Sequence, residues 1–228
     1  MRIFAIADTH LSGNPAKKPM SVFGSHWENH WEKIKTDWMS RVTAQDTVLL
    51  AGDISWAMKL DEALFDLNEI AELPGNKIIT KGNHDYWWQT VVKMTAAVNH
   101  RLTFLQNSFV GIDSYAICGS RGWICPDDPY FSPSDRSIYE REVSRVKTSL
   151  LAAEAAGYNR LILMLHYPPC YANLPSGFTQ LMDEFKVELC VFGHLHDEAI
   201  KDAPTQGTCT NYHLVSADAL DFKLKLIV

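Results

Sequence analysis

Short apolar runs alternate with amphipathic segments along the whole chain, a pattern typical of a layered α/β fold. We predict strands at Arg2–Ala7, Thr47–Ala51, Lys77–Thr80, Leu102–Leu105, Tyr115–Cys118, Arg160–Leu165 and Leu189–Phe192. Two later runs, His213–Ser216 and Phe222–Val228, are expected to form a closing pair, because the second alternates apolar and polar residues.

Four segments have the apolar spacing of helices. In Asp61–Leu73 the apolar positions fall on one face, so we expect a helix there. Helices are also expected over Tyr86–Val98 and Trp27–Val42. A longer helix is expected from about Ser134 to Ala156, where Gly157 follows as a natural helix-ending residue.

No internal repeat or linker divides the sequence, so we expect one domain over residues 1–228. The two long segments with the least regular pattern are Ser12–Ser25 and Gly119–Pro133. The segment around 12–42 is expected to form a cap or an inserted loop, and the segment around 119–133 is a long loop rich in Pro and Gly. Long loops inside a compact domain usually carry function.

Composition and charge narrow the class of protein. Hydrophobic residues make up 46% and charged residues 21%, which is ordinary for one globular domain. The net charge of −6 provides no basic field that would attract nucleic acid or anionic lipid. No apolar run approaches the ~20 residues of a membrane helix, and the N-terminus lacks the pattern of a signal peptide. The five cysteines are odd in number and contain no C-x-x-C pair, so we expect reduced thiols and a cytoplasmic location.

Polar side chains follow five of the predicted strands directly. They are Asp8, Thr9 and His10; Gly52 and Asp53; Asn83, His84 and Asp85; His166; and His194 and His196. Because the carboxyl ends of strands in α/β sheets are where loops converge, we expect these side chains to meet in one site.

Each of these residues also has a purely structural interpretation. Asp8 and Asp53 would serve as helix N-caps. His166 would be a buried, hydrogen-bonded core residue, while one of His194 and His196 would be buried and the other exposed on a strand. Separate explanations of this kind do not account for five of the nine histidines standing at strand ends beside Gly or an acid. A single cluster of metal-ligand side chains does.

The ligand types indicate which metals fit. Carboxylate and amide oxygens combined with imidazole nitrogens, without thiolates, favour Mn²⁺, Fe²⁺ or Zn²⁺ over the all-oxygen preferences of Ca²⁺ and Mg²⁺. Seven candidate ligands are too many for one ion and suit two ions that share a bridging carboxylate. Such a site would attract a phosphate and deprotonate a bound water.

In this order, the motifs DTH, GD, GNHD, LHYPP and GHLH resemble those of the calcineurin-like metallophosphoesterases, from residue 8 to residue 196. The resemblance implies a four-layer α/β/β/α sandwich of two packed mixed sheets, with the metal site at the carboxyl ends of the strands. It also implies a phosphohydrolase that cleaves a phosphate monoester or diester by in-line attack of a metal-bound hydroxide.

Carried over position by position, the resemblance assigns roles to the motif residues. One metal would be held by Asp8, His10, Asp53 and His196, and the other by Asp53, Asn83, His166 and His194. Asp53 would bridge the two ions. His84 would assist departure of the leaving group, and Asp85 would orient the His84 ring. After GD the chain reads ISWAMKLDEA, without the acid that the family often has soon after this motif, so no role is transferred there.

Three residues outside the motifs are candidates for substrate contact. Arg121, in GSRGW, would either reach a substrate phosphate by a bidentate contact or be a structural arginine, and the sequence leaves both open. His26 and His30 would face the site if the segment around 12–42 is a cap. The tryptophans beside them have helical spacing and are expected to pack in the core.

We expect the partner to be a small phosphoester, with no membrane association. Two other interpretations stay open. A nuclease would use the aromatic residues as stacking platforms, but the net charge of −6 disfavours a long polyanion. A non-catalytic scaffold of the same fold should lack ligands or His84, whereas every motif position is filled here.

Overall fold

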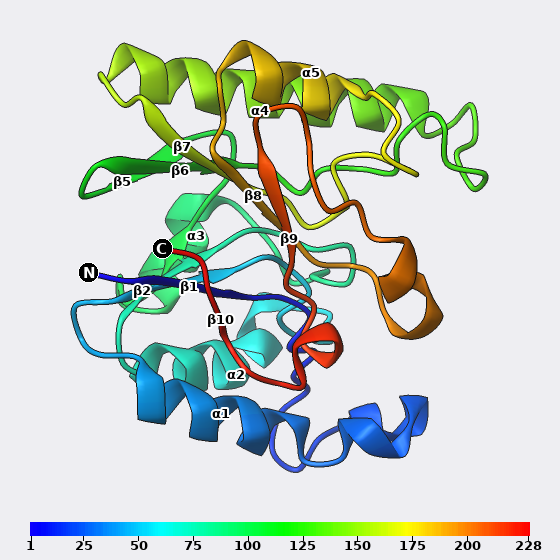
Figure 1. Cartoon of the computed structure of the whole chain (residues 1–228). Helices are drawn as coiled ribbons and strands as arrows, with labels where there is room; N and C mark the ends of the chain where they lie inside the picture. The colour runs from blue at the N-terminus through cyan, green and yellow to red at the C-terminus, as the bar shows by residue number, and fades with distance from the viewer.

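The computed structural model describes residues 1–228, which form two five-stranded sheets packed face to face (Figure 1). The first sheet has the order β10-β1-β2-β3-β4. Its strands are β1 (Ile3–Ile6), β2 (Thr47–Leu50), β3 (Asn76–Ile79), β4 (Thr103–Phe104) and β10 (Lys225–Leu226). All neighbouring strands are parallel except β10, which pairs antiparallel with β1.

The second sheet has the order β5-β6-β7-β8-β9. Its strands are β5 (Phe109–Ile112), β6 (Tyr115–Gly119), β7 (Arg160–Met164), β8 (Leu189–Phe192) and β9 (Asn211–Leu214). The strands β6 to β9 are parallel, and β5 joins β6 in an antiparallel hairpin. Both sheets are therefore mixed, as expected from the sequence.

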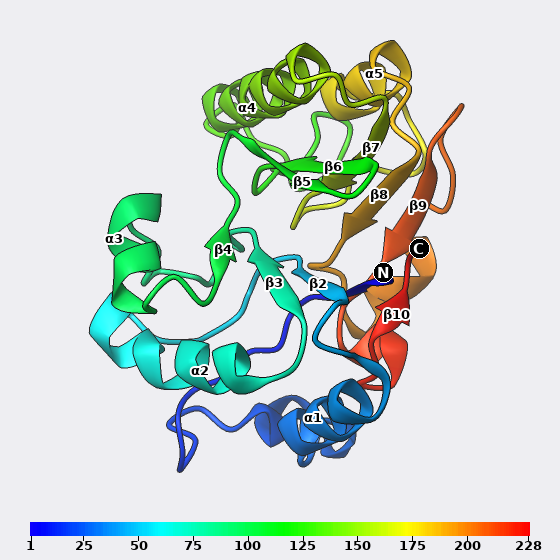
Figure 2. The same cartoon turned by 90° about the vertical axis from the view of Figure 1, so that its left-hand side faces the viewer.

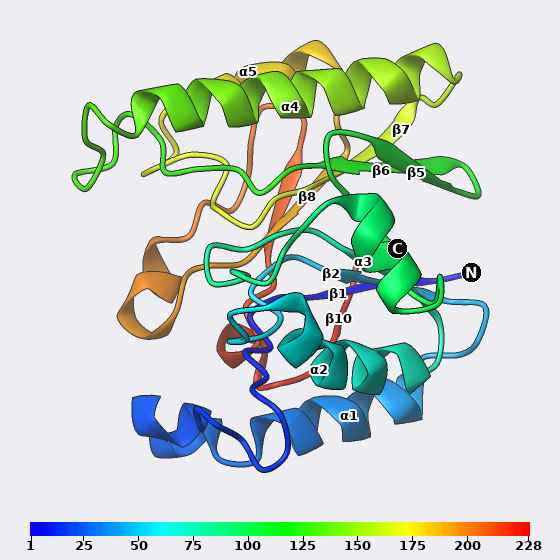
Figure 3. The ribbon, with the colours of Figure 1, turned by 180° about the vertical axis from the view of Figure 1, so that it is seen from behind.

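Helices cover the outer face of each sheet (Figures 1 and 3). The first sheet is covered by α1 (His30–Arg41) and α2 (Leu60–Glu72), and α3 (Val91–Ala97) lies beside its edge strand β4 (Figure 2). The second sheet is covered by α4 (Arg136–Ala155) and α5 (Gly177–Glu184). The predicted α/β/β/α sandwich is confirmed. None of the helices combines the length and the apolar character needed to cross a bilayer.

Alternating residues of the strands explain why the layers stack in this order. In β1, Ile3 and Ala5 belong to the apolar cluster between the sheets, whereas Phe4 and Ile6 belong to the cluster under α1 and α2. Successive side chains of a strand point to opposite faces, so an all-apolar strand must be covered on both. The short aliphatic runs of the sequence are thus the strands that two layers bury.

Several elements differ from the sequence prediction. The helix expected over Tyr86–Val98 begins only at Val91, with Thr90 as its N-cap, because the preceding residues turn around Asp85. The hairpin strand β5 and the helix α5 were not predicted. The expected closing pair is wrong: β9 belongs to the second sheet and β10 to the first. A strand pairs with whichever edge is free, and local alternation carries no information about that choice.

Candidate metal centre

The seven metal-ligand candidates meet where the carboxyl ends of the two sheets come together. Asp8 and His10 follow β1, Asp53 follows β2, and Asn83 follows β3 in the first sheet. His166 follows β7, and His194 and His196 follow β8 in the second. The structure therefore brings the residues that follow these five strands together.

The backbone bends sharply to aim these side chains inward. Asp8, His10, Asp53 and His194 all have positive φ, at 59°, 46°, 54° and 72°. A positive φ is unfavourable for a residue with a Cβ atom, and such strained residues cluster at functional sites. The chain thus leaves β1, β2 and β8 by a turn that presents the next polar side chain to the centre.

Glycines in the motifs allow the close approach of these turns. A Cβ atom on Gly52 would lie 2.7 Å from Nδ1 of His166, and one on Gly193 would lie 2.5 Å from Oδ2 of Asp8. A Cβ atom on Gly82 would collide with the carboxylate and the backbone of Asp53. The Gly before each ligand in GD, GN and GH is therefore required by packing at the centre.

One group of ligand atoms surrounds Oδ1 of Asp8. Nε2 of His196 lies 3.6 Å from this oxygen, and Nε2 of His10 lies 3.9 Å from it. Oδ1 of Asp8 is buried and has no hydrogen-bond partner, and neither does Nδ1 of His10. Ligands that each lie ~2.0–2.2 Å from one ion are separated by about these distances. The geometry fits a divalent cation among the three side chains.

A second group surrounds the side chain of Asn83. Nδ1 of His166 lies 3.0 Å from the carbonyl oxygen of Ala51, which leaves Nε2 to face the centre. This nitrogen is 2.7 Å from Oδ1 of Asn83 and 3.4 Å from Oδ2 of Asp53. Nδ1 of His194 lies 3.0 Å from the same amide oxygen. Four side chains thus offer ligand atoms to one small volume.

Asp53 and Asp8 are the two carboxylates near both groups of ligand atoms. Oδ2 of Asp53 lies 3.4 Å from Nε2 of His166 and 4.0 Å from Nε2 of His10, so it faces both. Asp8 also lies near His166, but its contact of 3.9 Å is with Nδ1, the nitrogen that already has Ala51 as partner. The hydrogen-bond pattern therefore favours Asp53 as the shared carboxylate.

Buried charge gives an independent test of whether cations fit this site. Burial opposes protonation of His166, but the carboxylates of Asp53 and Asp8 raise its pKa to about 9. Burial also opposes protonation of His196, whose pKa Asp218 and Asp8 raise to about 10. The carboxylates thus draw positive charge onto these two imidazoles, whereas burial lowers the pKa of His10 to about 4 and that of His194 to about 3. A divalent ion would displace those protons, because a ligating nitrogen must be deprotonated.

Comparison with known proteins identifies the family of the chain. The family model for calcineurin-like phosphoesterases matches residues 1–198. The chain belongs to the calcineurin-like phosphoesterase family. It is therefore a metal-dependent hydrolase that acts on phosphoester bonds, and its Asp/His groups are of the kind that could hold metal ions.

Solved structures share the fold of this calcineurin-like phosphoesterase at low sequence identity. Phosphopantetheinyl hydrolase from Mycobacterium tuberculosis is 13% identical, with a TM-score of 0.62, coverage of 100% of this chain and 95% of that one. The protein TT1561 of Thermus thermophilus is 13% identical, with a TM-score of 0.61 and coverage of 99% and 98%. Calcineurin-like phosphoesterase YfkN from Bacillus subtilis is 12% identical, with a TM-score of 0.52 and coverage of 94% and 80%. No curated protein sequence matches the chain.

His84 of this phosphoesterase stands apart from the ligand candidates. Its ring is half-buried, with its centroid 4.4 Å from that of Trp56 and 5.8 Å from that of His10. Its backbone N–H donates to Oδ1 of Asp53 at 2.8 Å, which leaves Oδ2 of that carboxylate free to face the centre. Burial lowers the pKa of the His84 ring. The ring therefore lies at the mouth of the centre without ligating distances of its own.

Asp85 does not orient His84, which corrects the expectation from the sequence. Its carboxylate accepts hydrogen bonds from the backbone N–H groups of Gly82, Asp53, Ile54 and Ser55 and from Nε1 of Trp87. None of these donors is the His84 ring. Burial, reinforced by the charge of Asp53, raises the pKa of Asp85 to about 6. Asp85 is fully buried, and its hydrogen bonds hold the turn after β3 against the turn after β2.

Asp218 is a functional candidate that the sequence reasoning missed. Its Oδ1 lies 2.9 Å from Nδ1 of His196, and its Oδ2 accepts the N–H of Asp197 at 3.2 Å. Through His196 it fixes which ring nitrogen faces Asp8. A signal existed, since Asp218 follows β9 as the other candidates follow their strands. The sequence pattern pairs this strand with Phe222–Val228, so it does not predict that the end of the strand lies beside the other strand ends.

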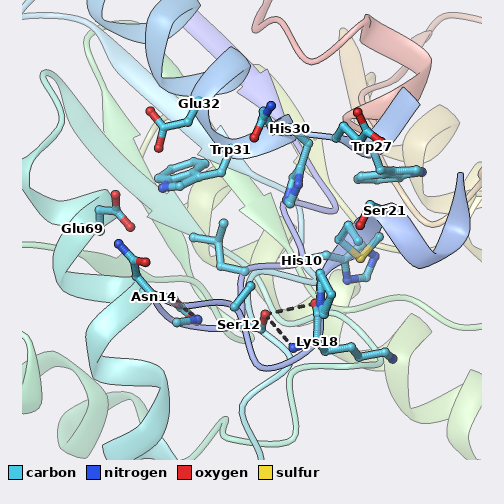
Figure 4. A pocket seen from close by; sticks show the side chains of 18 residues that line it. His10, Ser12, Asn14, Lys18, Ser21, Trp27, His30, Trp31, Glu32 and Glu69 are labelled. Atoms are coloured by element: carbon cyan, nitrogen blue, oxygen red, sulfur yellow. Dashed lines mark hydrogen bonds between the residues drawn. The ribbon is translucent and has the colours of Figure 1, made fainter. Parts of the chain in front are cut away.

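A cavity of about 300 Å³ opens above the centre. Its walls combine His10, Asp53, His84, His194 and His196 with Met20, Phe23, Trp27, Trp56 and Asp197. A second hollow of about 520 Å³ adjoins it, sharing His10, Met20 and Trp27 (Figure 4). Figure 4 shows His10 and Lys18 on one side of this hollow and Trp31, Glu32 and Glu69 on the other. The segment around 12–42 therefore lines the approach to the centre.

The three residues outside the motifs lie in different places. Nε2 of His30 lies 2.9 Å from the carbonyl oxygen of Thr9, within the wall of the larger hollow. His26 is exposed, 3.6 Å from Asp197. Arg121 does not line the cavity above the centre, because its guanidinium stacks on Trp123 and borders a different cavity.

Proposed function

We propose that this phosphoesterase hydrolyses a small phosphate monoester or diester at a centre of two divalent ions, chosen from Mn²⁺, Fe²⁺ and Zn²⁺. The observation that carries the proposal is Oδ2 of Asp53, which lies 4.0 Å from Nε2 of His10 and 3.4 Å from Nε2 of His166. One carboxylate oxygen thus faces both groups of ligand atoms, as a bridge between two ions requires. The proposed ligand sets are Asp8, His10, Asp53 and His196, and Asp53, Asn83, His166 and His194.

When bound, the ions would neutralise phosphate oxygens and lower the pKa of a water molecule, so that hydrolysis needs no covalent intermediate. The side chains around them hold that arrangement rigid. Ala51 and Asp218 fix the tautomers of His166 and His196. Asp85 fixes the turn that carries Asn83 and His84.

We assign His84 to the leaving group. Its ring lines the cavity at the centre and is not part of either ligand group, so when protonated it is free to donate to the departing oxygen. Because burial lowers the pKa of the ring, this contribution should decrease as the pH rises. The cavity of about 300 Å³ and its aromatic walls fit a small organic phosphoester better than a long polyanion. The five cysteines are all free thiols, which supports a cytoplasmic location.

The test measures metal content and turnover together. Purified protein is reconstituted with Mn²⁺, Fe²⁺ or Zn²⁺, and the bound ions are counted by elemental analysis. Hydrolysis is then measured on p-nitrophenyl phosphate, bis(p-nitrophenyl) phosphate and single-stranded DNA. We expect two ions per chain and metal-dependent turnover of at least one aryl ester. Asp53→Asn should weaken both sites and abolish most turnover, whereas exposed Asp127→Asn should change neither.

Two results would contradict the proposal. A single bound ion in fully active protein would remove the bridging role of Asp53, as would full metal content and turnover in Asp53→Asn. Faster hydrolysis of DNA than of both aryl esters would instead favour a nuclease.

A further inference from the structure

A third cavity, of about 400 Å³ and lined mainly by polar residues, lies at the boundary between the two sheets. It is bordered by the end of β3, the chain before α3, the β4–β5 connection, the start of the loop after β6 and one face of α4. Figure 2 shows α3 and α4 along the side of the molecule where the chain passes from β4 to β5. None of the residues that line it also lines the cavity above the metal centre.

Positive charge is concentrated in this cavity. Lys81, Arg121, Arg141 and Arg145 line it, against one acid, Glu142. Arg145 pairs with Oε1 of Glu142 at 2.6 Å, and Nη2 of Arg121 lies at 4.0 Å from the same oxygen. Lys81 and Arg141 have no acidic partner. Unpaired cations gathered around a hollow attract an anion, and guanidinium groups match the geometry of a phosphate.

Buried polar atoms without partners mark the same cavity. Seven buried side-chain oxygen or nitrogen atoms of the chain lack a hydrogen-bond partner. Two belong to the metal centre, on Asp8 and His10, and three belong to residues that line this cavity. These three are Oγ1 of Thr80, Oδ1 of Asn107 and Oε2 of Glu142. Such atoms are costly unless a ligand or ordered water satisfies them.

We propose that this cavity binds a small organophosphate whose body carries hydroxyl or amino groups. The phosphate would bind Lys81, Arg121 and Arg141. Hydroxyl or amino groups would donate to Oε2 of Glu142 and Oδ1 of Asn107, while the Thr80 hydroxyl can donate or accept. Glu142 is 1% exposed, so it adds specificity for a donor-bearing ligand over a bare anion.

The cavity also touches segments that build the metal centre. Lys81 precedes Asn83 by two residues, and the carbonyl oxygen of Arg121 accepts the backbone N–H of His166 at 2.9 Å. A ligand held by Lys81 and Arg121 would therefore rest against the segments that carry two of the proposed metal ligands. The binding site itself does not depend on the proposed hydrolysis.

Calorimetric titration of the full chain tests the proposal, with the Asp53→Asn substitution present in every protein to remove binding and hydrolysis at the metal centre. The probes are ribose 5-phosphate, adenosine 5′-monophosphate, inorganic phosphate and ribose. We expect one site per chain for the two organophosphates and weaker binding of inorganic phosphate and ribose. Adding Lys81→Gln or Arg121→Gln should weaken organophosphate binding about 10-fold or more, because each removes a charge-assisted hydrogen bond.

Two further variants separate this site from general attraction of anions. Lys147→Gln removes a positive charge from the same helix, α4, but its ammonium lies 3.9 Å from Glu184 and outside the cavity, so affinity should not change. Glu142→Gln should leave inorganic phosphate binding equal or tighter while reducing the advantage of ribose 5-phosphate over it. Tighter binding of adenosine 5′-monophosphate than of ribose 5-phosphate would assign a nucleotide, and equal binding a sugar phosphate.

Three results would overturn the proposal. The first is that neither organophosphate binds at millimolar concentration. The second is that Lys147→Gln weakens organophosphate binding as much as Lys81→Gln does. The third is that inorganic phosphate binds as tightly as ribose 5-phosphate. The proposed function is tested separately by turnover of the wild-type protein. An absence of turnover there would not change the result of these titrations.

Discussion

His84 differs from the other histidines of the centre in being placed beside the ligand groups and outside them. Replacing it with Asn should therefore keep both ions while lowering kcat by roughly 10²–10⁴-fold, the usual contribution of general acid catalysis. The loss should be larger for an alkyl ester than for an aryl ester with a phenol of low pKa, because a good leaving group needs less protonation. Steady-state kinetics with both ester types and elemental analysis check this.

The matched control is His100→Asn, since His100 is exposed and lies away from the centre. Loss of a metal ion from His84→Asn would make His84 a ligand. Equal rate losses for the two ester types would make it a residue that only positions the substrate.

Asp218 provides a second test at the level of one side chain. Asp218→Asn keeps the shape of the residue but weakens its hold on Nδ1 of His196, now 2.9 Å away. Loss of such a supporting carboxylate typically costs 10–100-fold in metal affinity. Competition between the protein and a chromophoric chelator measures it, with Asp127→Asn as the control on an exposed acid outside both ligand groups. An unchanged affinity would mean that His196 needs no partner.

At the scale of elements, Asp46 joins the start of β1 to the turn before β2. Its carboxylate accepts hydrogen bonds from the backbone and guanidinium of Arg2 and from the backbone and hydroxyl of Thr43. The Arg2 guanidinium, supported by Thr43, holds the pKa of Asp46 well below its ordinary value. A depressed pKa stabilises the fold above the unfolded value of ~3.9, and this stabilisation is lost as the pH falls toward the folded value.

Asp46→Asn should therefore lower the Tm by a few degrees at pH 7. The difference from the wild type should shrink as the pH falls below ~4, because the unfolded wild-type chain then takes up a proton on Asp46 that the folded chain does not. Thermal unfolding of the metal-free proteins from pH 3 to pH 8 measures both. A difference that stays constant over this range would mean that the hydrogen bonds act through shape and not through charge.

The sequence predicts those elements whose pattern is visible within a short run of residues. An apolar run that ends in Gly and an acid or a His marks both a buried strand and a ligand, so nine strands and the ligand set could be proposed from spacing and motifs. The strand β5 is half-buried and contains Gly111, so its pattern was too weak to notice. Pairing partners depend on the whole fold, and this is why the separation of β9 from β10, the hydrogen bonds of Asp85 and the role of Asp218 were not foreseen.

At the scale of the whole molecule, the centre lies across the junction of the two sheets. Asp8, Asp53 and Asn83 come from the first sheet, and His166, His194 and His196 from the second. Bound ions would therefore hold the layers together and stabilise only the folded chain. Free metal at about 100 times its Kd should raise the Tm by about 5–10 °C for each bound ion, since binding at one such site contributes about 2.7 kcal/mol.

Thermal unfolding with and without a chelator measures this effect. Asp53→Asn should remove most of the metal dependence, while Asp127→Asn should retain it. A metal-independent Tm in a protein that binds two ions would mean that the ions bind the unfolded chain equally well.

The pairing of β10 with β1 has a consequence for folding during synthesis on the ribosome. The first strand of the chain can gain its outer neighbour only from a segment near the other end of the chain, at Lys225 and Leu226. The side chains of the centre are similarly spread from Asp8 to Asp218. A nascent chain therefore carries the ligand candidates that follow β1, β2 and β3 before the histidines that follow β7 and β8 have been made. Hydrolytic capacity should therefore appear only after the segment that contains His194, His196 and Asp218 has been synthesised.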